Sequence, residues 1–508
     1  MPFAKDPIDW IEAAGRTNRP FLRSPHGCDF SYAALVEQSG RIASALMERG
    51  VQAGDRVAAQ VDKSAEAIFL YVACLRMGAV FVPINVANTP NEVDYFLRDS
   101  RPRLAVVRPQ DRVLIEPLAR QAEVACVETL GVAGDGSLPR LASESSAEIN
   151  TQHKHESASI AAIIYTSGTT GRAKGAMLTR GNLASNAAVL AQSWRFSGED
   201  VLLHTLPLFH IHGLFVAINT VLASMSSLLL LPKFDAAQAL EHFSQASVYM
   251  GVPTHYTRLL QQRNLNRATT ATVRLFVSGS APLPAETHRE FRQRTGHQIL
   301  ERYGMSETMM NTSNPYDGVR LPGSVGPPLK GVSLRVANAE TGALELEPDV
   351  VGALQVKGPN VFAGYWRDEA KTRDEFTADG WFNTGDLGRI DRNGYVHIVG
   401  RAKDLVISGG YNVYPKEVES ELDAVEGVLE SAVFGVPHPD FGEGVTAVVV
   451  AKPGVVLSEE SIIESVKPRL ARYKVPKRIL LVEELPRNSM GKVQKNALRK
   501  TFAAIYAA

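Results

Sequence analysis

A stretch rich in glycine and hydroxyl groups, residues 165–175, is the first place where this chain could do chemistry. Glycines let the backbone approach a ligand and turn its N–H groups toward an anion. Hydroxyl side chains add hydrogen-bond donors, and one lysine adds positive charge. This combination suits the phosphates of a nucleoside triphosphate, and the residues that would supply it are Thr166, Ser167, Gly168, Thr169, Thr170, Gly171 and Lys174.

The stretch differs from a Walker A loop, because Lys174 lies between Ala173 and Gly175 instead of between a glycine and a Ser or Thr. An apolar run at 160–164 precedes it and predicts a buried strand. Residues 182–186 follow it and can open a helix. We therefore predict a strand, loop and helix in that order; the alternative is a flexible surface loop.

Further polar groups follow along the chain. Glu307 comes after a strand-like apolar pair and can hold Mg²⁺ against phosphate oxygens. Asp386 ends a glycine-containing run and suits the two hydroxyls of a ribose. His210 lies beside a proline, a phenylalanine and a second histidine, which indicates either a pocket wall or a turn. Lys492 lies on a glycine-containing loop; taken alone, it predicts only surface charge.

The bulk composition narrows the class of protein. The 508 residues carry 54 Lys plus Arg and 54 Asp plus Glu, so no net charge draws the chain to nucleic acid or to a membrane surface. The three cysteines lie outside any metal-ligand spacing. The longest apolar stretch, 213–231, includes an asparagine and several hydroxyls and predicts a buried helix and strand. With no signal-peptide pattern, we expect a cytoplasmic protein.

The elements that must position these groups follow an α/β rhythm. Helical periodicity at 31–50 precedes a strand at 56–61, and Thr89, Pro90 and Glu92 predict a capped helix start. This alternation favours parallel sheets covered by helices. Glycines and charges at 400–410 indicate a domain boundary. Beyond it we predict a smaller α/β unit that includes a helix over 458–473.

Five segments together, at 165–175, 303–307, 385–386, 400–401 and 491–492, resemble the adenylate-forming superfamily of acyl-CoA synthetases, peptide-synthetase adenylation domains and beetle luciferases. The resemblance covers the chain from about residue 30 to about residue 500. It implies a large N-terminal domain of stacked α/β subdomains over 1–400 and a hinge at 401–406. It also implies a small, mobile α+β domain over 407–508.

The resemblance also implies roles for individual residues. ATP would be held by the glycine-rich stretch together with Tyr303, and Mg²⁺ by Glu307 with Thr170. Asp386 and Arg401 would hold the ribose, and Lys492 would bridge the carboxylate and the adenylate. Lys403 would be the hinge, and Gly409 and Gly410 would line a passage for CoA.

Within the superfamily, the chain resembles the malonyl-CoA synthetase subgroup in two places. Arg302 precedes Tyr303, and a Met-Met-Asn-Thr-Ser run follows Glu307. A guanidinium pairs a carboxylate through two hydrogen bonds, so an arginine at the acyl pocket suits a dicarboxylate. The expected substrates are malonate and methylmalonate, and the residues expected to line their pocket are Arg302, Ser280, His210, Ile211 and Met310.

Besides the dicarboxylate–CoA ligase, two alternatives stay open at this point. The enzyme could activate another small acid, with Arg302 in a structural ion pair to Glu301 or another acid. It could also be an inactive nucleotide-binding module, although Lys492, Glu307 and Asp386 argue against that. The chain ends soon after Lys492, so we expect no carrier domain. Acetylation of Lys492 would remove its charge, which makes regulation by a lysine acetyltransferase and deacetylase plausible.

Overall fold

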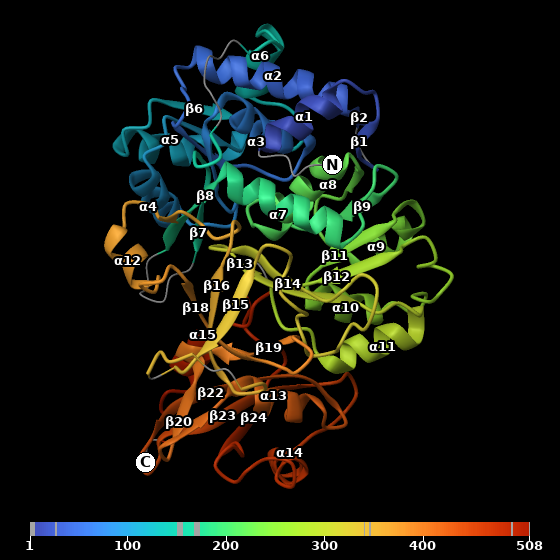
Figure 1. Cartoon of the computed structure of the whole chain (residues 1–508), viewed down its shortest axis with the longest axis vertical. Helices are drawn as coiled ribbons and strands as arrows, with labels where there is room; N and C mark the ends of the chain where they lie inside the picture. Colours follow the sequence, from blue (N-terminus) through green and yellow to red (C-terminus); the bar gives the residue numbers. More distant parts are fainter. Residues whose placement is uncertain are drawn as a thin grey trace.

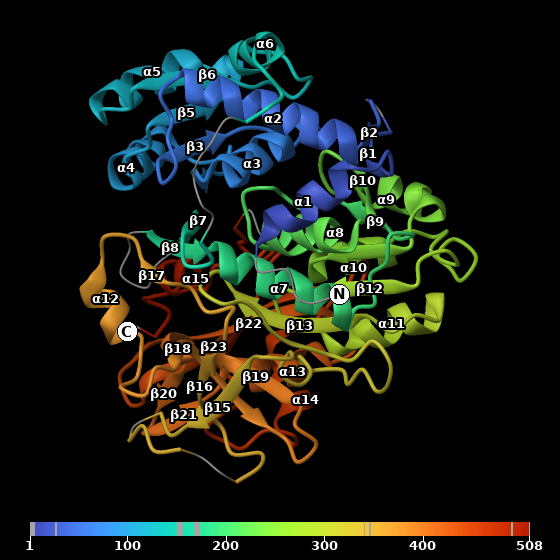
Figure 2. The same ribbon diagram turned by 45° about the horizontal axis from the view of Figure 1, so that its top comes forward.

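Figure 1 shows the computed structural model of the chain, which describes residues 6–25, 28–149, 156–166, 173–339, 341–344, 347–488 and 491–506. It is an α/β protein with a large N-terminal domain and a small C-terminal domain, as predicted. The small domain lies at the opposite end of the molecule from α2 and α6 in both views (Figures 1 and 2).

Two mixed sheets form the bulk of the large domain. The first runs in the order β17 (Gly364–Tyr365), β8 (Lys174–Thr179), β7 (Ile160–Thr166), β4 (Val80–Pro83), β3 (Arg56–Gln60), β5 (Leu104–Val107) and β6 (Cys126–Thr129). The second runs in the order β14 (Met309–Ser313), β13 (Leu300–Met305), β12 (Leu275–Ser278), β11 (Val248–Gly251), β9 (Val201–His204), β10 (Ser227–Leu230), β1 (Pro20–Arg23) and β2 (Phe30–Ser31). Strands β13, β12, β11, β9, β10 and β1 are parallel.

Helices cover these sheets, and their starts follow the expected capping chemistry. Thr89 and Glu92 form a capping box at the start of α4, as predicted. The helices of the large domain are α1 (Pro7–Gly15), α2 (Tyr32–Glu48), α3 (Ala65–Met77), α4 (Pro90–Ser100), α5 (Arg112–Gln121), α6 (Ser137–Glu144), α7 (Arg180–Ser193), α8 (Asn219–Ser224), α9 (Ala236–His242), α10 (Pro253–Leu260), α11 (Ala285–Thr295) and α12 (Glu369–Asp374). None of the described helices is both long and apolar enough to cross a bilayer.

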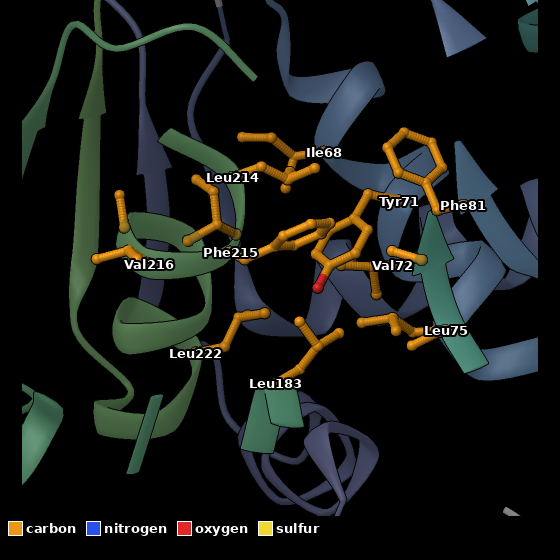
Figure 3. Packing of buried hydrophobic residues seen from close by; sticks show 14 of the residues in the cluster. Ile68, Tyr71, Val72, Leu75, Phe81, Leu183, Leu214, Phe215, Val216 and Leu222 are labelled. Atoms are coloured by element: carbon orange, nitrogen blue, oxygen red, sulfur yellow. The ribbon is translucent and has the colours of Figure 1, made fainter. Parts of the chain in front are cut away.

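The main hydrophobic core joins both sheets. Figure 3 shows Tyr71 of α3 between Phe81 of β4 and Phe215, with ring centroids 5.5 and 5.6 Å apart. Phe215 belongs to a π-helix, His212–Ile218, that leads directly into α8. The Tyr71 hydroxyl donates to Asn219 Oδ1 at 2.9 Å, which satisfies it inside the core. This packing fixes the segment that begins at His210 and His212.

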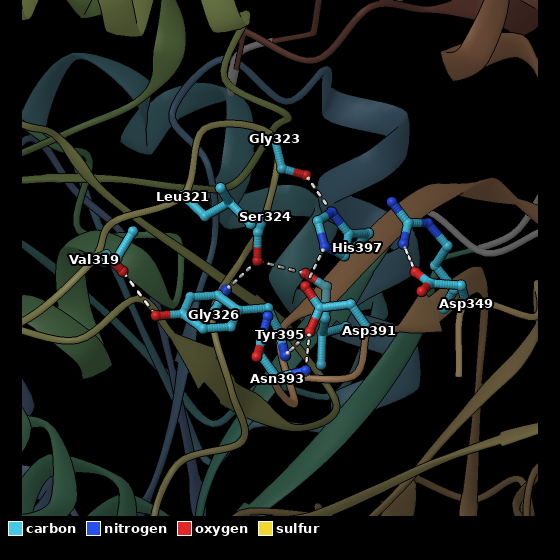
Figure 4. A network of polar contacts seen from close by, with 12 residues as sticks. Val319, Leu321, Gly323, Ser324, Gly326, Asp349, Asp391, Asn393, Tyr395 and His397 are labelled. Atoms are coloured by element: carbon cyan, nitrogen blue, oxygen red, sulfur yellow. Dashed lines mark hydrogen bonds and ion pairs between the residues drawn. The ribbon is translucent and has the colours of Figure 1, made fainter. Parts of the chain in front are cut away.

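An antiparallel sheet follows, made of β15 (Ser333–Ala337), β16 (Gly352–Lys357), β18 (Phe382–Ile390) and β19 (Val396–Arg401). Polar contacts tie β19 to the loop over 319–326 (Figure 4). Ser324 donates to the carbonyl of Val396 at 3.0 Å, and Tyr395 donates to the carbonyl of Val319 at 2.8 Å. These contacts hold the start of β19 on the large domain, and Arg401 lies at the other end of the strand.

The small domain is built on a sheet in the order β21 (Tyr411–Val413), β20 (Val406–Ser408), β23 (Gly442–Ala451) and β22 (Val428–His438), with β24 (Arg478–Leu481) beside β23. Its helices are α13 (Pro415–Asp423), α14 (Glu459–Val466) and α15 (Lys495–Thr501). A short 3₁₀ turn, Ala402–Asp404, joins the domains. Arg499 of α15 pairs with Asp404 at 2.8 Å, so the far end of this turn is tied to the small domain.

Two sequence-based predictions were wrong. The helix predicted at 182–186 is confirmed within α7, which begins at Arg180 and is capped by Thr179. The predicted order of strand, loop and helix is wrong because it omits β8, the strand that follows the glycine-rich stretch and pairs with β7. Buried Ala176 and Leu178 place β8 in the sheet, which accounts for the difference. The helix predicted over 458–473 ends at Val466, two residues before Pro468, because proline has no N–H to donate to the carbonyl four residues earlier in the helix.

Candidate active site

The flanks of the glycine-rich stretch lie side by side at the ends of β7 and β8. Thr166 and Lys174 are partners across the two strands, and the Thr166 hydroxyl is 3.5 Å from the Lys174 carbonyl. The Lys174 ammonium lies 5.4 Å from the centre of the Tyr365 ring, a cation–π contact. The predicted phosphate ligands Ser167, Gly168, Thr169, Thr170 and Gly171 lie outside the described residues.

An ion pair and a hydrogen bond link the residues predicted to hold the ribose. Asp386 of β18 and Arg401 of β19 are strand partners, and their side chains form an ion pair at 2.7 Å. The Tyr303 hydroxyl donates to the other Asp386 oxygen at 2.5 Å. Burial raises the pKa of Asp386, and Arg401 opposes that shift. The carboxylate is thus held in place by groups of this chain before any ligand arrives.

Glu307 is the carboxylate expected to hold Mg²⁺. It is buried, and Tyr365 donates a hydrogen bond to its Oε1 at 3.1 Å. No cluster of three or more His, Cys, Asp or Glu ligands occurs among the described residues. Mg²⁺ at phosphate sites typically uses one or two carboxylates together with substrate oxygens and water. A single buried carboxylate near Lys174 fits that mode.

Arg302 is a buried cation without a counter-charge. Its side chain is 3% exposed, and neither Nε nor Nη2 has a hydrogen-bond partner among the described residues. Burial lowers the pKa of Arg302 to about 9. The neighbouring acid Glu301 instead accepts a hydrogen bond from the backbone of Leu283 at 2.9 Å. No ion pair between Arg302 and an acid forms in the part of the chain described.

Ser280 and His212 lie beside Arg302. Ser280 Oγ is 3.2 Å from His212 Nδ1, and Ser280 has a positive φ of 69°, a strained conformation that is common at functional sites. Gly279 packs directly on the guanidinium, since a Cβ there would lie 2.4 Å from Arg302 Cζ. Burial, with help from the Arg302 charge, lowers the pKa of His212, so the ring is neutral.

The other predicted pocket residues gather around this group. Burial and the charges of Lys492 and Arg302 lower the pKa of His210 to about 3. Ile211 and Met310 are buried in the same apolar cluster. Met310 also packs on the backbone of Gly304, where a Cβ would lie 2.6 Å from its Cε. Met310 lies on β14, the strand that pairs with the strand carrying Arg302.

Lys492 comes from the small domain but lies among large-domain groups. Its side chain keeps contact with solvent, yet protein atoms around the ammonium and the charge of Arg401 lower the pKa of Lys492. Asp386 and Glu307 oppose that shift, because their charges act on the ammonium. The adjacent Gly491 packs against Thr254 at the start of α10. Lys492 therefore lies within electrostatic reach of Asp386, Glu307 and Arg302 of the large domain.

The predicted hinge residue lies within electrostatic reach of Asp386, whereas the predicted CoA residues belong to the small domain. Lys403 is exposed in the turn between the domains. Gly409 and Gly410 are exposed and have positive φ values of 59° and 82°, which form the β20–β21 turn. Phe441 lies next to Gly409, with its Cδ1 3.4 Å from a Cβ built there.

The sequence interpretation missed two residues of the site. His212, rather than His210, meets Ser280; its place in the same His-Ile-His motif was the available signal. Tyr365 meets both Glu307 and Lys174, and no local pattern marks it. Tyr365 lies on β17, which pairs with β8 through tertiary structure alone.

Comparison with known proteins agrees with this geometry. The family model described as AMP-binding enzyme matches residues 10–366, and the model of the AMP-binding enzyme C-terminal domain matches residues 417–492. A mitochondrial malonate–CoA ligase of Mus musculus is 36% identical over 92% of this chain and 86% of its own length. A sulfoacetate–CoA ligase of Cupriavidus necator is 34% identical over 96% of this chain and 95% of its own length.

Among solved structures, ATP-bound MatB from Rhodopseudomonas palustris is 53% identical, with a TM-score of 0.95 over 99% of this chain and 100% of its own. The apo form of the same protein has a TM-score of 0.85 over 99% of this chain and 100% of its own. Since identity is the same, the scores place this arrangement nearer to the ATP-bound form. On these matches, the chain belongs to the AMP-binding enzyme family and is an ATP-dependent, AMP-forming acid–CoA ligase.

Proposed function

We propose that this ligase activates malonate, and also methylmalonate, as an acyl-adenylate and then transfers the acyl group to CoA. The observation that carries this proposal is Arg302, a buried guanidinium with free donors and no acid partner in the described structure. An isolated buried cation is costly unless a ligand supplies the missing charge. The second carboxylate of malonate would supply it, and Ser280 with His212 offers further hydrogen bonds.

In the proposed first step, the other carboxylate attacks the α-phosphorus of ATP, and pyrophosphate leaves. Such chemistry depends mostly on positioning and on neutralising charge. Lys492 is suited to bridge the attacking carboxylate and the α-phosphate, because its ammonium lies near both Asp386 and Arg302. Glu307 would hold Mg²⁺, which would neutralise phosphate charge. Asp386 and Arg401 would keep their ion pair and would also form hydrogen bonds to the ribose, which would orient it.

In the proposed second step, the small domain turns about Lys403 and the CoA thiol attacks the acyl carbon, which releases AMP. The exposed glycine turn at Gly409 and Gly410 would then line the approach of the thiol. Exposure of Lys403 in a short turn between two separately packed domains supports a hinge there. Acetylation of Lys492 would remove the charge needed in the first step, so we propose it as a point of regulation.

A guanidinium also pairs with a sulfonate, and one relative bears the name sulfoacetate–CoA ligase, so sulfoacetate is the second candidate acid. The test is ATP–pyrophosphate exchange with malonate, methylmalonate, sulfoacetate, succinate, acetate and propionate at equal concentrations. We expect the highest kcat/KM for malonate. A preference for sulfoacetate would mean that sulfoacetate, not malonate, is the substrate, and Arg302 would keep its proposed role. A preference for acetate or propionate would overturn the proposal.

A further inference from the structure

Helix α4 carries two polar side chains that reach the two ends of the glycine-rich stretch. Tyr95 and Asp99 are four residues apart and so share one face of the helix. The Tyr95 hydroxyl donates to the carbonyl of Ala173 at 2.7 Å, just before β8. The Asp99 carboxylate accepts from the Tyr165 hydroxyl at 2.6 Å, near the end of β7. One turn of α4 therefore spaces the last residues of β7 from the first residues of β8.

These contacts are more than incidental packing. Phe96 of α4 lies 4.6 Å from the Tyr165 ring and Tyr95 lies 6.3 Å from it, so the Tyr165 side chain is enclosed on the helix side. Burial, followed by the hydrogen bond to Asp99, raises the pKa of Tyr165. Asp99 lies in the last turn of α4, where an acid opposes the helix dipole. Its position is explained by the bond to Tyr165 and not by helix stability.

The same helix end is connected to Glu307 through the segment after β17. The backbone carbonyl of Asp99 accepts a hydrogen bond from the Trp366 indole at 3.0 Å. The Trp366 amide donates to the carbonyl of Gly175 at 2.7 Å, beside Lys174. The preceding residue, Tyr365, donates to Glu307 and contacts the Lys174 ammonium. Asp99 thus accepts hydrogen bonds from Tyr165 of β7 and from Trp366, the residue next to the Tyr365 that donates to Glu307.

We propose that Tyr95 and Asp99 are positioning residues for ATP, which set Thr166 and Lys174 at a fixed spacing and hold them in register with Glu307. This inference rests on the proposed function only in placing the ATP phosphates at Thr166, Lys174 and Glu307. It does not depend on which acid is activated. Neither residue touches substrate; each acts through a hydrogen bond to the strand ends.

The experiment measures ATP–pyrophosphate exchange with whichever acid the wild-type enzyme prefers, for Tyr95→Phe, Asp99→Ala and Asp99→Asn. Loss of one net hydrogen bond should raise the KM for ATP about three- to tenfold in Tyr95→Phe and Asp99→Ala. Asp99→Asn keeps an acceptor oxygen for Tyr165 and should stay within about twofold of wild type. The KM for the acid, and thioester formation from supplied acyl-adenylate, should not change.

Tyr395→Phe is the matched control, because Tyr395 also donates to a backbone carbonyl but lies at the far loop of β19. It removes the same kind of bond and should leave the KM for ATP unchanged. The proposal is overturned if Tyr95→Phe and Asp99→Ala do not raise the KM for ATP above that of Tyr395→Phe. It is equally overturned if the thioester step falls as much as the exchange, or if Asp99→Asn is as impaired as Asp99→Ala. The test stays valid if the enzyme prefers another acid, because it compares the KM for ATP.

Discussion

Two regions of the site treat buried charge in opposite ways. At the ribose end, Asp386 is buried with its oxygens already engaged by Arg401 and Tyr303. At the acyl end, Arg302 is just as deeply buried but has free donors and no acid partner among the described residues. The first region is paired within the chain, whereas under the proposed function the second would be paired by an anionic ligand.

The difference separates two ways of using a charge. An internally paired group stays in one geometry and can orient a neutral ligand such as a ribose at little further cost. An unpaired buried cation costs free energy in the empty protein, and that cost is recovered only by an anionic ligand. Under the proposed function, the acyl end would therefore select acids with a second charge. Five substitutions test this comparison.

The largest effect should come from Arg302→Met, which removes the unpaired cation and keeps an apolar side chain. Breaking a buried ion pair typically costs about 3–5 kcal/mol, or roughly a hundredfold to several thousandfold. We expect kcat/KM for malonate to fall by that factor, while the KM for ATP changes little. Thermal unfolding without ligand should occur at the same or a higher temperature than in wild type. A clear drop in unfolding temperature would mean that Arg302 is structural.

Lys492→Ala should be next, because Lys492 lies between the two regions. Losing one group that stabilises transition-state charge costs roughly a hundredfold to a thousandfold. We expect that loss in ATP–pyrophosphate exchange, with normal conversion of supplied acyl-adenylate and CoA to thioester. Full exchange activity in the variant would remove Lys492 from the first step.

Arg401→Met should lower the free energy of unfolding, whereas Arg302→Met should not. The reason is that Arg401→Met leaves Asp386 buried without its partner. Since Arg401 is partly exposed, the loss should be about 1–3 kcal/mol, between the values for surface and buried pairs. Urea unfolding of both variants at neutral pH measures the contrast. Equal stability of the two would show that pairing does not distinguish the regions.

Lys403→Pro tests the proposed second step, in which the small domain turns and carries Lys492 away from both regions. Proline fixes φ at a position that must change it if the small domain turns there. We expect thioester formation to fall about tenfold more than exchange, by analogy with gated enzymes. Assays of the two half-reactions on one preparation give the ratio, and an equal loss would place the hinge elsewhere.

The smallest effect should come from Tyr303→Phe, which removes one of the two partners of Asp386 but leaves Arg401 in place. A single hydrogen bond contributes about 0.5–1.5 kcal/mol. We expect the KM for ATP to rise severalfold at most and the KM for malonate to stay unchanged. A larger rise for malonate than for ATP would mean that Tyr303 serves the acyl end.

Local and motif-level features were readable from the sequence. The capping box at Thr89 was correct because its hydrogen bonds join residues three positions apart. The family motifs identified the class of enzyme, since their order and spacing are specific as a set. Leu35, Ile42 and Leu46 lie buried on one face of α2, as the helical period predicted.

What the sequence could not provide depends on residues that are far apart along the chain. Tyr303 and Asp386 meet across 83 positions, and Tyr365 meets Glu307 across 58. The strand β8 was missed because its place in the sheet comes from pairing with β7 and β17, which no local period encodes. Likewise, the sequence supplied Arg302 next to Glu301, and only the fold decided whether they pair. Successive side chains of β13 point to opposite sides, so Glu301 accepts a hydrogen bond from Leu283 while Arg302 lies on the other side of the strand.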